Sequence, residues 1–217
     1  MTPPINPGMI LLDLDGTLAD SLSVMHIAYR VFLKKFHRKA TVAEFNSLNG
    51  PPLLEVVRSL RHLHAIQDTE EILLSIYSDI IEQAYAEVKP ANGALDLLQK
   101  AKEHGCTIGI VTSNTRKRTQ TWLETVRLGH MIDFIISGEE VIKGKPHAEP
   151  YLAALKKASC NPADIVAIED SPQGAQSAIN AGLKTFVIVR GSAGHFWPRG
   201  VELIPSLFQV IERLFIN

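Results

Sequence analysis

The chain has 217 residues, of which 46% are hydrophobic and 21% are charged, and its formal net charge at pH 7 is -1. This length suits one large domain, or a core domain with a smaller insertion. The near-neutral charge gives no electrostatic attraction to nucleic acid or to an anionic membrane surface, so neither is expected as a partner.

No signal for export or membrane insertion is visible in the sequence. Residues 1–8 contain no basic region and no apolar stretch of a signal peptide, and no run reaches the ~18 apolar residues of a membrane span. The cysteines, Cys106 and Cys160, fit no metal-binding or redox spacing and are expected to be inert thiols in a reducing compartment. We therefore expect a cytoplasmic protein, either a monomer or a homodimer.

Short apolar runs alternate with helical patterns along most of the chain. Runs rich in Ile and Val predict buried strands at residues 9–13, 107–112, 133–137, 165–170 and 185–189. Helical spacing occurs at residues 93–105, 116–129, 149–159 and 171–182, and the tail at 201–215 predicts a short edge strand and a closing helix. This alternation predicts an α/β fold, with a Rossmann-like, doubly wound parallel sheet.

Residues 20–88 interrupt the alternation. They offer helical patterns and no strand candidate, and the spacing of Thr41 and Glu44 is typical of a capping box at a helix start. The simplest interpretation is an all-helical cap domain over residues 20–88, inserted into a core made of residues 1–19 and 89–217. Its two connections, near residues 17–21 and 88–92, would act as hinges of a lid.

Polar side chains follow the predicted strands at the points where these strands end. They are, in chain order, Asp13, Asp15, Thr112, Ser113, Asn114, Lys143, Lys145, Glu169 and Asp170. Ligands of a parallel sheet bind outside the carboxyl ends of its strands, so we expect most of these side chains to meet on one rim. Lys143 is expected to be a solvated loop lysine.

Four carboxylates around one cleft would repel one another and raise some of their pKa values. A divalent cation with oxygen ligands relieves this repulsion, and Mg²⁺ is the usual ion beside phosphate groups. Lys145 would add a second positive charge, while Thr112 and the backbone amides after it could hold phosphate oxygens at a helix N-terminus. One carboxylate is then available to attack phosphorus, and another to act as acid and base.

These segments carry a specific resemblance. "DLDGTL" at 13–18, "VTSN" at 111–114, "KGKPHAEPY" at 143–151 and "IEDSPQGAQSAINAG" at 168–182 resemble the four motifs of the haloacid dehalogenase superfamily, in the same order and over essentially the whole chain. The helical insertion resembles that family's C1-type cap. The pattern is most similar to the branch of phosphoglycolate phosphatases, small sugar phosphatases and β-phosphoglucomutase.

The resemblance implies roles for the matching residues. Asp13 would be the nucleophile that forms an aspartyl-phosphate, and Gly16 would permit the turn after it. Asp15 would protonate the leaving oxygen and then activate the water that hydrolyses the intermediate. The residues that would bind the transferring phosphoryl group are Thr112, Ser113, Asn114 and Lys145.

The same resemblance implies a metal site. Asp13, Asp170 and the backbone carbonyl of Asp15 would bind Mg²⁺. Glu169 would lie close by, either reaching the metal or acting as a hydrogen-bond acceptor beside it. Gly174 would allow a helix to pack closely on the sheet.

Individual residues help to choose between the reactions that members of this family catalyse. Asp15 favours phosphoryl transfer, because haloalkanoate dehalogenases lack this second aspartate and their leaving halide needs no proton. A phosphomutase needs a basic cap residue, but the segment 49–57 is apolar where an arginine would be expected, and Arg58 and Arg61 lie further along. A phosphonatase needs a cap lysine, and residues 40–88 contain none.

The sequence therefore predicts a Mg²⁺-dependent phosphohydrolase that encloses a small phosphorylated metabolite between cap and core. A phosphomutase is the enzymatic alternative. A binding protein that keeps the fold and the metal site without useful turnover is the non-enzymatic one. The four motifs do not select the substrate, because specificity lies in the cap.

Overall fold

One parallel sheet forms the centre of the molecule. The computed structural model describes residues 5–48, 51–158, 161–189 and 196–216. Its six strands lie in the order β3-β2-β1-β4-β5-β6, and all neighbouring pairs are parallel. The strands are β1 (Met9–Leu12), β2 (Thr107–Val111), β3 (Phe134–Ile136), β4 (Ile165–Glu169), β5 (Lys184–Ile188) and β6 (Val201–Ile204). The predicted doubly wound fold, including the edge strand in the tail, is confirmed.

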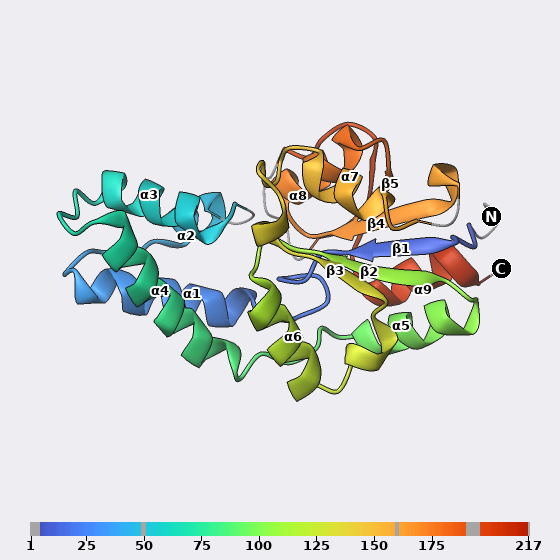
Figure 1. The fold of residues 1–217 in the computed structure, drawn as a ribbon, viewed down its shortest axis with the longest axis horizontal. Coiled ribbons are helices and arrows are strands. Elements are labelled where there is room, and N and C mark those ends of the chain that lie inside the picture. Colours follow the sequence, from blue (N-terminus) through green and yellow to red (C-terminus); the bar gives the residue numbers. More distant parts are fainter. Residues whose placement is uncertain (1–4, 49–50, 159–160, 190–195, 217) are drawn as a thin grey trace.

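Helices cover both faces of this sheet (Figure 1). One face carries α5 (Ala94–Glu103), α6 (Arg116–Thr125) and α9 (Leu207–Phe215), and the other carries α7 (Glu149–Leu155) and α8 (Pro172–Asn180). Side chains alternate along β1 as they must in a strand. Ile10 and Leu12 join the cluster of α5, α6 and α9, whereas Met9 and Leu11 pack with residues of α7 and α8. Both faces of β1 are therefore buried, which explains its continuous apolar run.

Four helices between β1 and α5 extend away from the sheet (Figure 1). They are α1 (Leu22–Lys35), α2 (Val42–Ser47), α3 (Leu53–Leu63) and α4 (Glu70–Tyr85). We call them the helical extension. Phe32 of α1 stacks on Tyr77 of α4, with ring centroids 4.5 Å apart. No strand occurs in residues 20–48 and 51–88, as the sequence predicts, and the division into a core and a cap domain stays a prediction.

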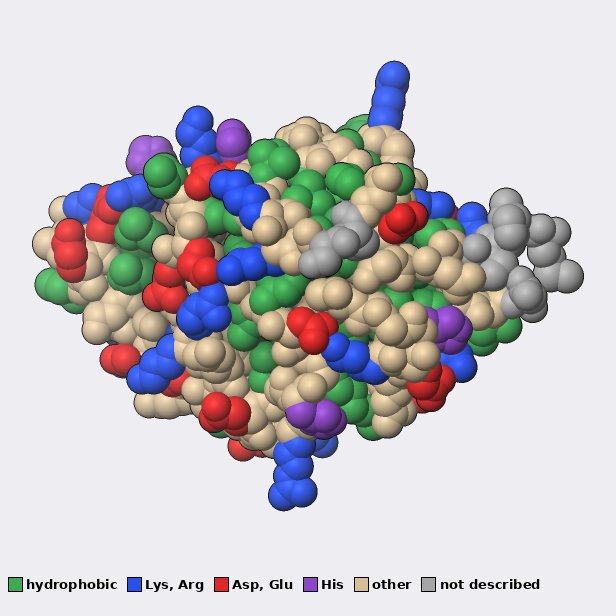
Figure 2. Space-filling view, turned by 45° about the vertical axis from the view of Figure 1, so that its right-hand side comes forward, with side chains coloured by type: hydrophobic (Ala, Val, Ile, Leu, Met, Phe, Trp, Pro, Cys, Tyr) green, Lys and Arg blue, Asp and Glu red, His purple; other side chains and the backbone are tan. Residues whose placement is uncertain are grey.

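The surface carries charges of both signs. Figure 2 shows basic and acidic side chains interspersed on the face in view, in keeping with the net charge of -1. Within the described ranges, no helix combines the length and the apolar character that a membrane crossing requires. Cys106 is buried and its Sγ donates to the carbonyl of Pro7 at 2.9 Å, while Cys160 lies outside the described residues.

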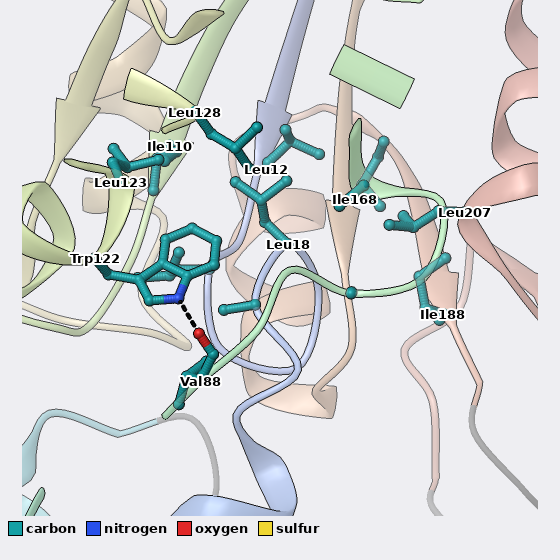
Figure 3. Packing of buried hydrophobic residues seen from close by; sticks show 14 of the residues in the cluster. Leu12, Leu18, Val88, Ile110, Trp122, Leu123, Leu128, Ile168, Ile188 and Leu207 are labelled. Atoms are coloured by element: carbon teal, nitrogen blue, oxygen red, sulfur yellow. Dashed lines mark hydrogen bonds between the residues drawn. The ribbon is translucent and has the colours of Figure 1, made fainter. Parts of the chain in front are cut away.

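The two connections of the helical extension run side by side. The N–H of Asp20 donates to the carbonyl of Lys89 at 2.8 Å, and the N–H of Ala91 donates to the carbonyl of Leu18 at 2.9 Å. Trp122 of α6 donates from Nε1 to the carbonyl of Val88 at 2.9 Å (Figure 3). The chain therefore leaves and re-enters the sheet region at one place, just beyond the end of β1.

Candidate active site

The central position of β1 determines which polar residues meet. Leu12 is in register with Ile110 of β2 on one side and with Ile168 of β4 on the other. Asp13 follows β1 directly, and its N–H donates to the carbonyl of Ile168 at 2.9 Å. The side chains brought to this edge by the three strands are those of Asp13, Asp15, Thr112, Glu169 and Asp170. The predicted rim of polar residues is therefore present.

Lys145 is the buried cation of this rim. Its Nζ donates at 2.6 Å to Oδ1 of Asp13, at 2.6 Å to Oε1 of Glu169 and at 3.0 Å to the carbonyl of Val111. Burial by itself would lower the pKa of Lys145, but the carboxylates of Asp13 and Glu169 raise it above its ordinary value. Lys145 is thus held as an ammonium ion against Asp13.

Glu169 lies at the end of β4 and is fully buried. Its Oε1 also accepts a 2.6 Å hydrogen bond from the hydroxyl of Tyr151, and its Oε2 is buried with no hydrogen-bond partner among the described residues. A Cβ on Gly174 would lie 2.0 Å from this Oε2, so the glycine leaves room for the carboxylate as well as for close packing of α8. Glu169 therefore binds Lys145 through Oε1, while its buried Oε2 remains available to a ligand such as a cation.

Three carboxylates form a cluster suited to a cation. Oxygens of Asp13, Glu169 and Asp170 lie within 4.8 Å of one another. Burial raises the pKa of Asp13 from 3.8 to about 8 although Lys145 opposes this, and burial with the charge of Asp13 raises the pKa of Asp170 as well. Gly16, at φ +86°, brings the loop so near Asp170 that a Cβ would lie 2.0 Å from Oδ2. An all-oxygen set with an unpartnered buried oxygen fits a hard divalent cation such as Mg²⁺.

Asp15 accepts hydrogen bonds at both of its oxygens. The hydroxyl of Tyr85 donates to Oδ1 at 2.8 Å, and Nδ2 of Asn114 donates to Oδ2 at 3.1 Å. Oδ1 of Asn114 accepts from the N–H of Thr115 at 2.9 Å and from Arg118 at 2.7 Å, which fixes the direction of the amide. The structure thus places the Asn114 side chain against Asp15, and its predicted contact with phosphate stays a prediction.

The loop after β2 leads into α6. Oγ1 of Thr112 accepts the N–H of Asn114 at 3.0 Å, which leaves the hydroxyl proton to donate to a ligand. Thr115 caps α6 by accepting the N–H of Arg118 at 3.2 Å. Thr112 and Ser113 both line the cavity described next, and their contact with a phosphate stays a prediction.

A cavity of about 140 Å³ lies between this rim and the helical extension. Its rim side is lined by Asp13, Asp15, Thr112, Ser113, Asn114, Thr115, Arg118, Lys145, Asp170 and Ser171. Pockets that hold drug-sized ligands usually measure about 300–1,000 Å³. The cavity therefore suits a small ligand, held with one end against the carboxylates and Lys145.

Three residues of the site carry no sequence pattern that predicts a role for them. Tyr151 lies inside the segment 143–151 that resembles a family motif, but nothing in the sequence indicates its hydrogen bond to Glu169. Tyr85 ends a mostly apolar helix, and Arg118 lies in a basic run that is typical of a solvated surface. Neither Tyr85 nor Arg118 carries a local signal of its contact with the site.

A family comparison agrees with this geometry. Residues 10–188 match the model of haloacid dehalogenase-like hydrolases. The chain belongs to this family.

Curated relatives add the class of reaction. Phosphoglycolate phosphatase 1 of Pseudomonas aeruginosa is 25% identical over 191 residues, which cover 85% of this chain and 70% of the relative. The bifunctional riboflavin kinase/FMN phosphatase of Arabidopsis thaliana is 24% identical over 209 residues, or 93% of this chain, but the match spans only 54% of that longer protein. These matches confirm the predicted class of enzyme, a phosphohydrolase of the family.

A solved structure agrees with the fold. CbbY of Rhodobacter sphaeroides, determined in complex with phosphate, superposes with a TM-score of 0.81 at 21% identity and covers 94% of this chain and 96% of its own.

Proposed function

We propose that the chain is a Mg²⁺-dependent phosphatase that hydrolyses a small phosphomonoester through a phosphorylated Asp13. The observation that carries this proposal is the buried pair of Asp13 and Lys145, 2.6 Å apart, on the wall of the cavity between the rim and the helical extension. A carboxylate held beside a fixed cation can attack phosphorus while the cation offsets the charge of the phosphate.

The first step transfers the phosphoryl group to the protein. A carboxylate oxygen of Asp13 forms a bond to phosphorus, and the bond from phosphorus to the leaving oxygen breaks. Asp15, in its protonated form, gives its proton to that oxygen, so that an alcohol departs. Lys145 and the hydroxyl of Thr112 bind the phosphoryl oxygens, since both line the cavity beside Asp13.

The second step restores the enzyme. Asp15, now a carboxylate, takes a proton from a water molecule whose oxygen bonds to phosphorus. The bond between phosphorus and Asp13 breaks, and inorganic phosphate leaves. Tyr85 and Asn114 each donate a hydrogen bond to Asp15, which holds its carboxyl group in place for both proton transfers.

Asp13, Asp170 and the backbone carbonyl of Asp15 would hold the Mg²⁺ ion, with Oε2 of Glu169 nearby. The ion supplies positive charge that offsets the clustered carboxylates and the phosphate oxygens. The helical extension, residues 20–88, would act as a cap domain that excludes bulk water from the site.

A phosphatase is favoured over a phosphomutase. A mutase must hold a second phosphate on the cap side, which requires a basic side chain there. Within residues 20–48 and 51–88, no charged side chain lines the cavity.

The test is release of phosphate from p-nitrophenyl phosphate by the metal-loaded protein. We expect turnover that EDTA abolishes, and loss of turnover in Asp13→Asn. Asp96→Asn is the matched control, because Asp96 is exposed on α5 and does not line the cavity. Failure of the folded, metal-loaded protein to cleave any phosphomonoester, or full activity in Asp13→Asn, would contradict the proposal.

A further inference from the structure

The cavity has two chemically different halves. The rim half carries the carboxylates, Lys145 and the hydroxyl groups described above. The half provided by the helical extension, which we call the apolar wall, is formed by hydrocarbon side chains from or beside all four of its helices. These are chiefly Met25, Phe45, Leu48, Leu53, Val56 and Ile81.

The apolar wall contains no charge, as far as the structure describes the extension. Arg58 and Arg61, on the helix that supplies Val56, do not line the cavity. Arg58 pairs with Glu70 at 2.7 Å, and Arg61 donates to the carbonyl of Asp68 at 2.9 Å. A carboxylate or second phosphate on the ligand would therefore have no cation on this side.

Arg118 also lines the cavity, at the start of α6, and its charge is already paired. Its Nε donates to Glu82 at 3.0 Å, its Nη1 to Asn114 at 2.7 Å and its Nη2 to Ser78 at 3.2 Å. The guanidinium thus binds groups of α4 and the Asn114 amide. Its contacts fix Asn114 and the end of the extension, and its charge is already paired with the carboxylate of Glu82.

Two tyrosines complete the apolar wall. The hydroxyl of Tyr29 is bound to Glu44 and to the N–H of Thr41, so the ring is its main contribution to the cavity. The hydroxyl of Tyr77 has no hydrogen-bond partner within the described ranges, and burial raises its pKa, so it is a neutral polar group. The wall therefore offers hydrocarbon surface and at most an uncharged hydroxyl.

We propose that the substrate is a small monophosphate ester whose leaving group is uncharged and mainly apolar, an alkyl or aryl alcohol. This inference rests on the proposed phosphatase activity and names its substrate class. A buried carboxylate or phosphate without a partner is strongly disfavoured, whereas an alkyl or aryl group gains from burial against this wall. The volume of about 140 Å³ limits the leaving group to a short alkyl chain or a single small ring.

The first test compares two esters of equal length on the wild-type enzyme, pentyl phosphate and 4-carboxybutyl phosphate. They share the phosphate and the attachment, and differ in a methyl or a carboxylate at the far end. We expect kcat/KM for pentyl phosphate to be larger by about 100-fold or more, because the carboxylate would be buried unpaired. Equal rates, or a preference for the carboxylate ester, would overturn the inference.

A pair of variants locates the preference in the apolar wall. Leu53 lines the cavity, whereas its neighbour Leu54 is 37% exposed and does not. Leu53→Lys should reduce the preference for pentyl phosphate by about tenfold or more, while Leu54→Lys keeps it. Equal effects of the two variants, both folded by circular dichroism, would overturn the inference. If the wild-type protein hydrolyses neither ester nor any other phosphomonoester, the proposed phosphatase activity is refuted, not the substrate class alone.

Discussion

The hydroxyl of Tyr85 donates a 2.8 Å hydrogen bond to Oδ1 of Asp15. Tyr85 is the last residue of α4 in the helical extension, and Asp15 lies in the loop after β1. A residue of the proposed cap therefore touches the proposed acid and base directly. This contact links the position of α4 directly to the position of the Asp15 side chain.

Tyr85→Phe should lower kcat by about 10- to 100-fold with little change in KM, because a hydrogen bond to a charged group contributes about 1.5–3 kcal/mol. The phenyl ring keeps the packing of α4, so the unfolding temperature should change little. Steady-state kinetics with a phosphomonoester measure the effect. An unchanged kcat would show that the contact does not position Asp15 for catalysis.

Lys145→Met should destabilise the metal-free protein by about 3–5 kcal/mol, because it leaves Asp13 and Glu169 buried without their cation. Lys143→Met is the matched control, since Lys143 lies in the same loop and is exposed. The control should change the free energy of unfolding by less than about 0.5 kcal/mol. Denaturant unfolding of both variants measures this difference, and equal stabilities would contradict the role given to Lys145.

Gly174→Ala should destabilise the protein by about 1–3 kcal/mol, because the new Cβ would meet Oε2 of Glu169 at 2.0 Å. Alanine otherwise stabilises a helix relative to glycine by about 1 kcal/mol, so the sign of the change is informative. In Gly129→Ala the nearest atom would be 3.9 Å away, and this control should be close to neutral. A stabilised Gly174→Ala protein would show that Glu169 does not occupy this space.

The stability of the metal-free protein should fall as the pH rises. The pKa of Asp13 is raised on folding from 3.8 to about 8, so the folded state binds the additional proton between these values. The stabilising effect of that proton is complete below about pH 3.8 and is lost as the pH rises through about 8. In EDTA, Asp13→Asn should therefore gain in unfolding temperature relative to the wild type as the pH increases. A difference that is independent of pH would contradict the raised pKa.

Much of the fold and rim could be predicted from local patterns. Parallel pairing follows from the alternation of strands and helices, and it brings the ends of neighbouring strands together. This rule alone predicts that four residues at or just beyond strand ends lie close together, namely Asp13, Thr112, Glu169 and Asp170. Lys145 also reaches Asp13 as the motif implies, although 132 residues separate them.

The contacts with the extension could not be predicted in this way. Tyr85 and Asp15 are 70 residues apart, and their meeting depends on how α4 packs beyond the sheet. Glu44 illustrates the same limit on a smaller scale. Thr41 caps α2 as expected, but the carboxylate of Glu44 binds Tyr29 and His64 and does not complete the capping box. Side-chain choices of this kind are set by tertiary packing, which the spacing of residues does not encode.

The most direct measurement is chemical trapping of Asp13 during turnover. The enzyme is quenched in acid while it hydrolyses a phosphomonoester with Mg²⁺, then treated with borohydride, which reduces an acyl phosphate to an alcohol. Peptide mass spectrometry should find a reduced side chain at position 13, in samples with substrate and in no sample without it. An unmodified Asp13 in rapidly turning-over enzyme, or reduction at another carboxylate, would contradict the proposed phosphorylated Asp13.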